Sequence, residues 1–160
     1  MPDKPFFKEP GQPTIIMIDQ QIAVTTDCVI FSQNDLGTKV LLVQRKIDPF
    51  KGKWALPGGF VETNEPLEEA AKRELQEESG LVIDRLEQLH TYGTPGRDPR
   101  GRTLTIAYLG FTQKEEAVKG ADDAADARWF DLQELPPLAF DHDQILQDAK
   151  RRIHKDKSNK

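Results

Sequence analysis

Residues 59–81 read GFVETNEPLEEAAKRELQEESGL, a glycine-led turn that runs into an acidic segment with helical periodicity. On a helical wheel at about 100° per residue, one apolar stripe contains Leu67, Ala70, Ala71 and Leu75. Glu74 and Glu78 fall inside this stripe, and Glu77 lies at its edge. A carboxylate that faces a protein core costs free energy unless it is paired or binds a metal. The pattern therefore predicts a helix whose inward acidic face binds a hard divalent cation such as Mg²⁺ or Mn²⁺.

The residues that flank this segment are typical of helix ends. Pro66 suits the first helical position, with Asn64 or Glu65 before it as the cap. Gly80 suits the left-handed residue that follows a helix. The glycine pair 58–59 allows tight curvature and the close approach of a ligand. The alternative interpretation is a solvated acidic helix, which is the usual meaning of a charge run.

The same stretch resembles the Nudix box, in which glycine, glutamate and an Arg-Glu-apolar-X-Glu-Glu-X-Gly core stand at fixed spacings. Every defined position of that pattern is filled, by Gly59, Glu65, Arg73, Glu74, Leu75, Glu77, Glu78, Gly80 and Leu81. The resemblance implies a Nudix hydrolase, an enzyme that cleaves a nucleoside diphosphate linked to another group. It also implies an α/β/α sandwich with a mixed β-sheet between helices.

By this resemblance, Mg²⁺ or Mn²⁺ is expected at a set of ligands formed by Glu74, Glu77, Glu78 and the backbone carbonyl of Gly58. Such ions neutralise the diphosphate and lower the pKa of bound water. Arg73 is expected to take part in catalysis by orienting a glutamate, or else to form an exposed helix pair with Glu69 or Glu77.

The general base is expected to be either a glutamate of the box or a carboxylate on a later loop. That loop offers Asp122, Asp123 and Asp126. The alternative for each of these aspartates is a solvated turn residue.

Composition narrows the class of protein. The 160 residues suit one domain (1–160), with an irregular segment at 1–13 and a charged tail at 154–160. A net charge of -5 argues against nucleic-acid binding through a broad basic surface. Neither a membrane span nor a signal peptide is expected, and Cys28 is the only cysteine, so a cytoplasmic protein is favoured.

The order of predicted elements gives an α/β fold with a helix on each face of a sheet. Strands are expected at 21–31, 38–45, 54–61, 103–111 and 127–132, and alternating apolar residues occur at 81–92. A polar turn is expected at 32–37, and a second helix at 141–153.

Two further segments bear on the substrate, GTPGRDPRG at 93–101 and LAFDHD at 138–143. Both resemble the ADP-ribose pyrophosphatase branch of the family, which implies cleavage of ADP-ribose to AMP and ribose 5-phosphate. Arginine forks suit phosphate groups, and aromatic rings can stack on a base. The expected substrate contacts are Arg45, Trp54, Phe60, Arg97, Arg100 and Phe140. Trp54 and Phe140 have a competing assignment as core residues.

Other functions stay open at this point. A nucleoside triphosphate pyrophosphohydrolase or a nucleotide-sugar hydrolase would use the same box. A non-catalytic ADP-ribose sensor belongs to another class, but similar sensors add a winged-helix domain, and only seven residues follow Ile153. A messenger-RNA cap hydrolase is disfavoured by the acidic charge. The expected partners are a small nucleotide and, by resemblance, a second copy in a homodimer.

Overall fold

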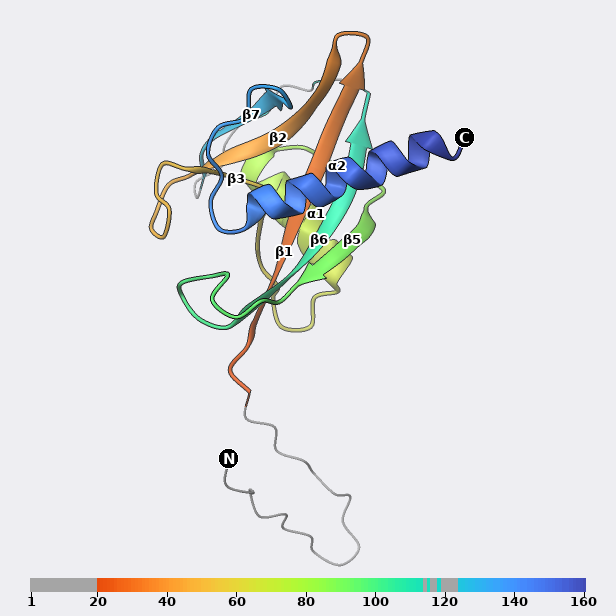
Figure 1. Ribbon diagram of the computed structural model, residues 1–160. Helices are drawn as coiled ribbons and strands as arrows, with labels where there is room; N and C mark the ends of the chain where they lie inside the picture. The colour runs from red at the N-terminus through yellow and green to blue at the C-terminus, as the bar shows by residue number, and fades with distance from the viewer. Residues whose placement is uncertain (1–19, 114, 116–117, 119–123) are drawn as a thin grey trace, which may run out of the picture.

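The computed structural model describes residues 20–113, 115, 118 and 124–160, and these form a seven-stranded sheet with a helix on each face (Figure 1). The strands are β1 (Ala23–Asn34), β2 (Gly37–Arg45), β3 (Trp54–Ala55), β4 (Gly58–Phe60), β5 (Glu87–Tyr92), β6 (Thr103–Thr112) and β7 (Ala124–Asp131). The order is β3-β2-β1-β6-β5, with β4 paired to β1 and β7 paired to β2. β1 and β6 run parallel, whereas β1 is antiparallel to β2 and β4, so the sheet is mixed. The predicted α/β sandwich is confirmed.

The central strand, β1, is buried on both faces because a helix covers each of them. Cys28 and Ile30 pack in the layer beneath α1 (Leu67–Ser79). Val29 and Phe31 pack in the opposite layer, beneath α2 (His142–Ser158). Alternate residues of a strand point to opposite faces, so this one run of apolar residues supplies both cores. Cys28 is fully buried in this strand.

Helix α1 begins one residue later than predicted. Pro66 is the N-cap and not the first helical residue, since its ψ of 144° is extended. The expected caps, Asn64 and Glu65, do not serve, because no side chain caps this helix end and the Glu65 carboxylate binds Arg73 instead. The predicted end is confirmed: Gly80 is left-handed with φ 75°, and its N–H donates to the carbonyl of Gln76.

Two predicted boundaries were wrong, and the segment of alternating apolar residues is only partly a strand. The turn expected at 32–37 is shorter, because Ser32, Gln33 and Asn34 pair with β2 and extend β1. Only Glu87–Tyr92 of the segment 81–92 is a strand, since this is the part that pairs with β6. The expected tail at 154–160 is helical as far as Ser158.

The longer second helix has local support at its end. Lys155 and Lys157 lie in the last turn, where positive charge interacts favourably with the helix dipole. The hydroxyl of Ser158 donates to the carbonyl of His154 at 3.1 Å. None of the helices in the described ranges is long and apolar enough to cross a membrane. The segment predicted to be irregular, 1–13, lies outside these ranges.

Candidate active site

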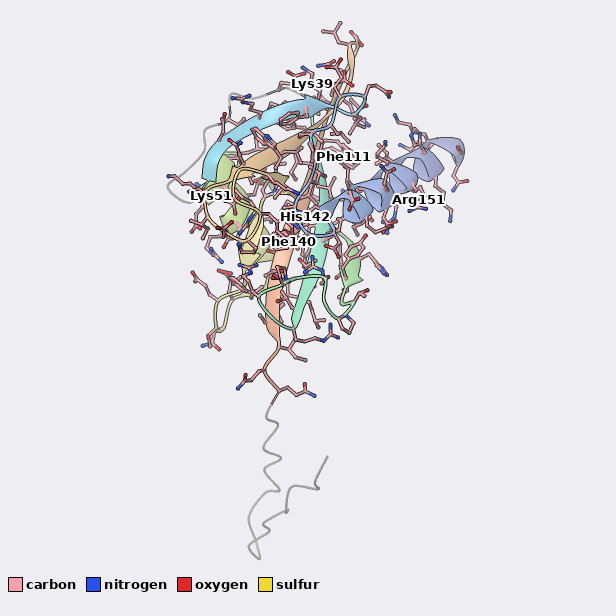
Figure 2. The ribbon with its side chains drawn as sticks, turned by 60° about the vertical axis from the view of Figure 1, so that its left-hand side comes forward. Lys39, Lys51, Phe111, Phe140, His142 and Arg151 are labelled. Atoms are coloured by element: carbon pink, nitrogen blue, oxygen red, sulfur yellow. The ribbon has the colours of Figure 1, made fainter. Side chains whose placement is uncertain are left out.

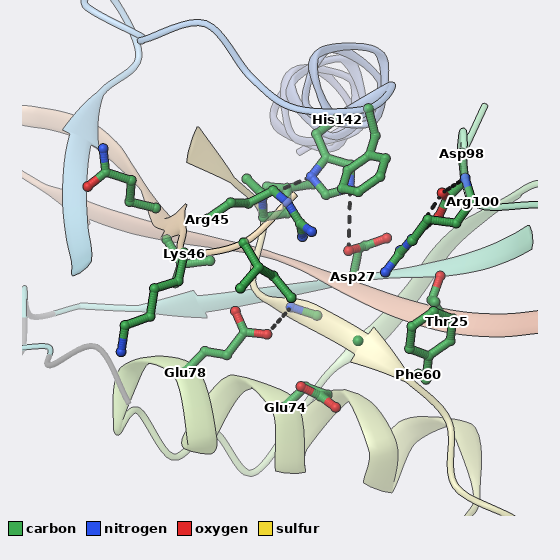
Figure 3. Close-up of a pocket in the computed structure, with 18 of the residues that line it drawn as sticks. Thr25, Asp27, Arg45, Lys46, Phe60, Glu74, Glu78, Asp98, Arg100 and His142 are labelled. Carbon is green, nitrogen blue, oxygen red and sulfur yellow. Dashed lines mark hydrogen bonds and ion pairs between the residues drawn. The ribbon is translucent and has the colours of Figure 1, made fainter. Parts of the chain in front are cut away.

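A pocket of about 510 Å³ opens between α1, the strands β1, β2 and β4, and the start of α2 (Figure 3). The loop between β5 and β6 completes its lining with Arg97, Asp98 and Arg100. Elements distant in sequence therefore meet here because the sheet aligns them. The pocket has an acidic wall on α1 and a basic wall on the side of Arg45 and Arg100.

The acidic wall consists of Glu74 and Glu78, both partly buried on the inward side of α1. Glu78 accepts a hydrogen bond from the Gly58 N–H at 3.4 Å. Burial raises the pKa of Glu78 well above its usual range, and the neighbouring Glu74 carboxylate adds to this rise. Burial also raises the pKa of Glu74, although Arg73 acts against it. The two carboxyls thus form an acidic pair beside β4 whose ionisation is opposed by burial.

The glycine pair lets β4 lie against this helix. A Cβ atom on Gly58 would lie 2.1 Å from the carbonyl oxygen of Thr26 in β1. A Cβ atom on Gly59 would lie 2.6 Å from the carboxyl carbon of Glu74. The contact at Gly58 is with backbone, so only glycine fits there, whereas at Gly59 the end of the Glu74 side chain would have to move.

Arg73 organises the remaining glutamates of the helix. Its guanidinium donates to Glu65 at 2.6 and 2.9 Å, to Glu74 at 2.9 Å and to Glu77 at 3.2 Å. It also donates to the carbonyl of Phe60 at 3.1 Å. The hydrogen bonds that Arg73 donates to the Glu65 carboxylate raise the pKa of Arg73 above its usual value. Arg73 therefore joins the loop before the helix to the acidic wall.

The structure does not bring Glu77 into the acidic pair, because this side chain is 56% exposed and turns to Arg73. In the described parts of the chain, no three acidic, histidine or cysteine side chains form a ready metal site. The donors nonetheless fit a hard divalent cation. Two partly buried carboxylates that repel each other, next to backbone oxygens, are the ligand type that Mg²⁺ and Mn²⁺ prefer.

The basic wall is built on the ring of Phe140. The guanidinium carbons of Arg45 and Arg100 lie 4.9 and 5.5 Å from the centre of this ring. Arg100 also lies 4.8 Å from the Phe60 ring, and its guanidinium pairs with Asp98 at 2.8 Å. Burial lowers the pKa of Arg45, and the positive charge of Arg100 lowers it further. Two like charges held this close form a site suited to an anion.

Phe140 has a backbone conformation unusual for a residue with a side chain, with φ 51°. Phe50, with φ 62°, packs edge-on against it at 4.8 Å. Residues held in such conformations are concentrated at functional sites. Figure 2 shows Phe140 beside His142 at the start of α2, far from Arg151 on the same helix.

The other predicted substrate contacts are placed differently. Arg97 lines the pocket, but its side chain is only 4% exposed and donates to both carboxylate oxygens of Asp141 at 2.9 and 2.6 Å. Asp141 is at the N-cap of α2 as expected, yet its carboxylate binds Arg97 and not the helix end. Trp54 is absent from the pocket lining and packs edge-on against Phe130 at 4.7 Å.

Two of the candidate bases, Asp122 and Asp123, lie outside the described residues. The third, Asp126, pairs with Arg128 at 2.7 Å.

Sequence reasoning placed His142 with Phe140 at the border of a ring-binding pocket, and both residues line the pocket, but it missed Asp27 and the buried pair that Asp27 forms with His142. Asp27 is a charged residue next to the buried apolar run 28–31 of β1, and this pattern marks a polar group with a specific partner. His142 gave no such signal, since its burial depends on where α2 meets the sheet. Gln44, Lys46 and Thr25 also line the pocket and were not predicted.

Comparison with known proteins identifies a matching family and similar proteins. The NUDIX domain family matches residues 22–149. The chain is 46% identical to an ADP-ribose pyrophosphatase of Methanocaldococcus jannaschii, over 81% of this chain and 73% of that protein.

Two regulatory proteins are also similar. The chain is 36% identical to the ADPR responsive transcriptional repressor NtrR of Acinetobacter baylyi, over 82% of this chain, and it spans 54% of that protein's length. The solved NUDIX domain of Shewanella oneidensis NrtR, in complex with ADP ribose, superposes with a TM-score of 0.80 at 37% identity. That match covers 84% of this chain and 90% of the solved domain.

Proposed function

The chain belongs to the NUDIX domain family, and we propose that this Nudix hydrolase cleaves ADP-ribose to AMP and ribose 5-phosphate. The observation that carries the proposal is the pocket itself, in which the Glu74–Glu78 wall faces the Arg45–Arg100 wall. The negative charges of a diphosphate have to be balanced by positive groups. Because the net charge of the protein is -5, these groups have to lie at the pocket itself. The similarity to an ADP-ribose pyrophosphatase supports this choice of substrate.

In the proposed reaction, the oxygen of a water molecule forms a bond to one phosphorus of the diphosphate. The bond from that phosphorus to the bridging oxygen breaks, and the other phosphate leaves with the bridging oxygen. The proton of the water passes to a base. Arg45 and Arg100 hold the diphosphate oxygens by charge-assisted hydrogen bonds and stabilise the charge that builds up on them.

Glu74, Glu78 and the carbonyl of Gly58 would hold a divalent cation, and Glu77 would join them by leaving Arg73. When bound, the cation neutralises phosphate charge and lowers the pKa of the attacking water. Arg73 keeps Glu74 in place through its 2.9 Å hydrogen bond and connects it to Glu65. We assign Arg73 to positioning on this basis.

The ends of the substrate would meet the aromatic part of the pocket. Phe60 is a large apolar side chain that is 46% exposed, with Arg100 4.8 Å from its ring, so the exposed part of the ring could stack on a base or pack on a ribose. Phe140 borders the same space, but the guanidinium groups of Arg45 and Arg100 already lie against its ring. We do not propose a ligand contact for Trp54, which lies outside the pocket lining.

A second candidate is a sensor that binds ADP-ribose without cleaving it. It is favoured by the similarity to the repressor NtrR and to the ADP-ribose-bound NrtR domain. The complete acidic pattern on α1 favours the hydrolase, because binding alone gives no reason to keep the costly pair Glu74–Glu78.

The two candidates are separated by a substrate panel with Mg²⁺ and with Mn²⁺, read by identifying products. The panel contains ADP-ribose, NADH, diadenosine polyphosphates, UDP-glucose, ADP-glucose, dGTP and oxidised dGTP. The proposal expects equal amounts of AMP and ribose 5-phosphate from ADP-ribose. Binding of ADP-ribose without products would favour the sensor, and release of pyrophosphate from a triphosphate would favour a nucleotide-sanitising enzyme.

A further inference from the structure

His142 is a buried residue that the proposed reaction does not use. It is 4% exposed at the first position of α2, and its Nδ1 accepts a hydrogen bond from the Leu56 N–H at 3.0 Å. An N–H group can donate only to a nitrogen with a free lone pair, so Nδ1 carries no proton. The ring proton of the neutral imidazole is therefore on Nε2, which lies 3.5 Å from Oδ1 of Asp27. Figure 3 shows both contacts.

Asp27, the second partner of His142, extends this series of polar contacts into the sheet. It is 6% exposed on β1, and its other carboxylate oxygen accepts a hydrogen bond from the hydroxyl of Thr105 on β6. Buried polar contacts of Leu56, His142, Asp27 and Thr105 thus link α2, β1, β6 and the connection between β3 and β4. A buried polar group that loses its partner costs free energy. This series of contacts therefore fixes the relative placement of the four residues.

The segment 56–58 is the part of the chain that His142 reaches, and it leads into the acidic wall. The carbonyl of Pro57 accepts a hydrogen bond from the Cys28 N–H at 2.8 Å. The Gly58 N–H donates to Glu78 at 3.4 Å. The segment is therefore attached to β1, to α1 and, through His142, to α2. Of these three attachments, only the one to α2 depends on a side chain outside the predicted Nudix pattern, namely that of His142.

We propose that His142 is a positioning residue of the active site, which holds segment 56–58 against Glu78 and holds Asp27 at the wall of the pocket. This inference rests on the proposed function, because it gives Gly58 and Glu78 their role in binding a divalent cation. His142 lines the pocket, but the role proposed for it is positioning and not contact with the substrate. It acts through Leu56 on one side of the ring and through Asp27 on the other.

Two variants separate these contacts. His142→Asn places an amide oxygen near the position of Nδ1, so it keeps an acceptor for the Leu56 N–H and loses the contact with Asp27. His142→Leu removes both contacts at similar volume. Ile145→Ala is the matched control, since Ile145 is fully buried on the same helix but is absent from the pocket lining. Its cavity destabilises the fold without touching the chain of polar contacts.

The measurement is Mn²⁺ affinity, followed by the resonance signal of the free ion, with kcat and KM for ADP-ribose. His142→Leu is expected to weaken Mn²⁺ binding by about 10- to 100-fold and to lower kcat with little change in KM. His142→Asn should recover part of this loss, and Ile145→Ala should bind Mn²⁺ like the wild type at a lower melting temperature. Wild-type affinity in His142→Leu, or an equal loss in Ile145→Ala, would overturn the inference.

A separate readout distinguishes failure of the inference from failure of the proposed function. If the wild-type protein neither binds Mn²⁺ nor cleaves ADP-ribose, the proposed function fails. Nitrogen-15 spectra of the imidazole then decide the placement of His142. A proton on Nε2, with a Leu56 amide signal that shifts in His142→Leu but not in Ile145→Ala, would support the placement. A proton on Nδ1 would overturn it.

Discussion

At the scale of single residues, the site is built from side chains that are unfavourable for folding. Glu78 is partly buried with one backbone hydrogen bond at 3.4 Å, and its pKa is raised by burial and by Glu74. An apolar residue at this position would stabilise the helix packing. A sequence that breaks local rules of stability does so mainly at functional sites, and this conflict made Glu74 and Glu78 identifiable from the sequence.

Replacing Glu78 should therefore separate activity from stability. Glu78→Gln is expected to lower kcat on ADP-ribose by about 100-fold or more, because the charge held at the reaction centre contributes several kcal/mol. The same variant should melt at a higher temperature than the wild type in the absence of metal, since a buried charge is removed. Steady-state kinetics and thermal unfolding in a chelator check both effects. The control is Glu68→Gln, which changes an exposed glutamate of the same helix.

Glu77→Gln offers a further comparison, because Glu77 is exposed and paired with Arg73 in this structure. It should lower kcat without raising the melting temperature. Full activity of both Glu77→Gln and Glu78→Gln at saturating Mg²⁺ would contradict the assignment of these residues to a metal.

His142 predicts a pH dependence of stability. Burial lowers its pKa below the value of 6.5 for an exposed histidine, although Asp27 acts in the opposite direction. As the pH falls through 6.5, the unfolded chain gains a proton at this residue before the folded chain does, so the free energy of unfolding decreases. His142→Asn lacks this group and should lose less stability between about pH 7.5 and about pH 5.5. Urea unfolding across this range checks the difference, and parallel curves for the two proteins would refute it.

At the scale of elements, the site depends on how closely β4 approaches its neighbours. The existence of α1, its glycine end and an extended segment around the glycine pair followed from local sequence patterns, whereas the start of α1 and the division of that segment into β3 and β4 did not. The link between Arg97 and Asp141 could not be predicted, because it joins a loop to the start of α2 across the sheet. The same holds for His142, which meets Leu56 only in the folded chain. Local patterns specify elements, whereas these contacts depend on tertiary packing.

The two glycines of β4 should respond differently to alanine. Gly58→Ala places a methyl group against the backbone oxygen of Thr26, which cannot move without separating β4 from β1. It should destabilise the protein by about 1–3 kcal/mol. Gly59→Ala meets only the end of the flexible Glu74 side chain, so it should keep most of the stability and lose activity. Chemical unfolding and ADP-ribose turnover test the pair, and equal destabilisation by both would contradict this geometry.

The loop between β5 and β6 should contain one structural and one substrate-binding arginine. Arg97→Met breaks a buried pair with Asp141 and should cost about 1–3 kcal/mol of stability. Arg100→Met removes a more exposed guanidinium near Phe60 and should raise KM for ADP-ribose by about tenfold to a hundredfold. It should also lower the stability, because it leaves the buried Asp98 carboxylate without its guanidinium partner. Unfolding curves and KM for both variants check this division. A raised KM in Arg97→Met alone would reverse the assignment.

At the scale of the whole molecule, an acidic protein with a net charge of -5 presents four arginines, Arg45, Arg73, Arg97 and Arg100, in the lining of one pocket. The mixed sheet makes this possible, because its strands align α1 on one face with the start of α2 on the other (Figure 1). The acidic wall was predictable from a pattern of 23 residues, 59–81. The basic wall was predicted only as a list of arginines, since the ring of Phe140 that gathers two of them is a feature of the folded chain. A single domain over 1–160 and a homodimer stay predictions.

The most direct test of the central claim is a competition between ADP-ribose and oxidised dGTP, mixed at equal concentration with the enzyme and Mg²⁺. The relative rates in such a mixture give the ratio of kcat/KM for the two substrates. We predict that ADP-ribose is consumed first, with AMP and ribose 5-phosphate formed in equal amounts while the triphosphate remains. Release of pyrophosphate with ADP-ribose left intact would contradict the assignment of the pocket to ADP-ribose.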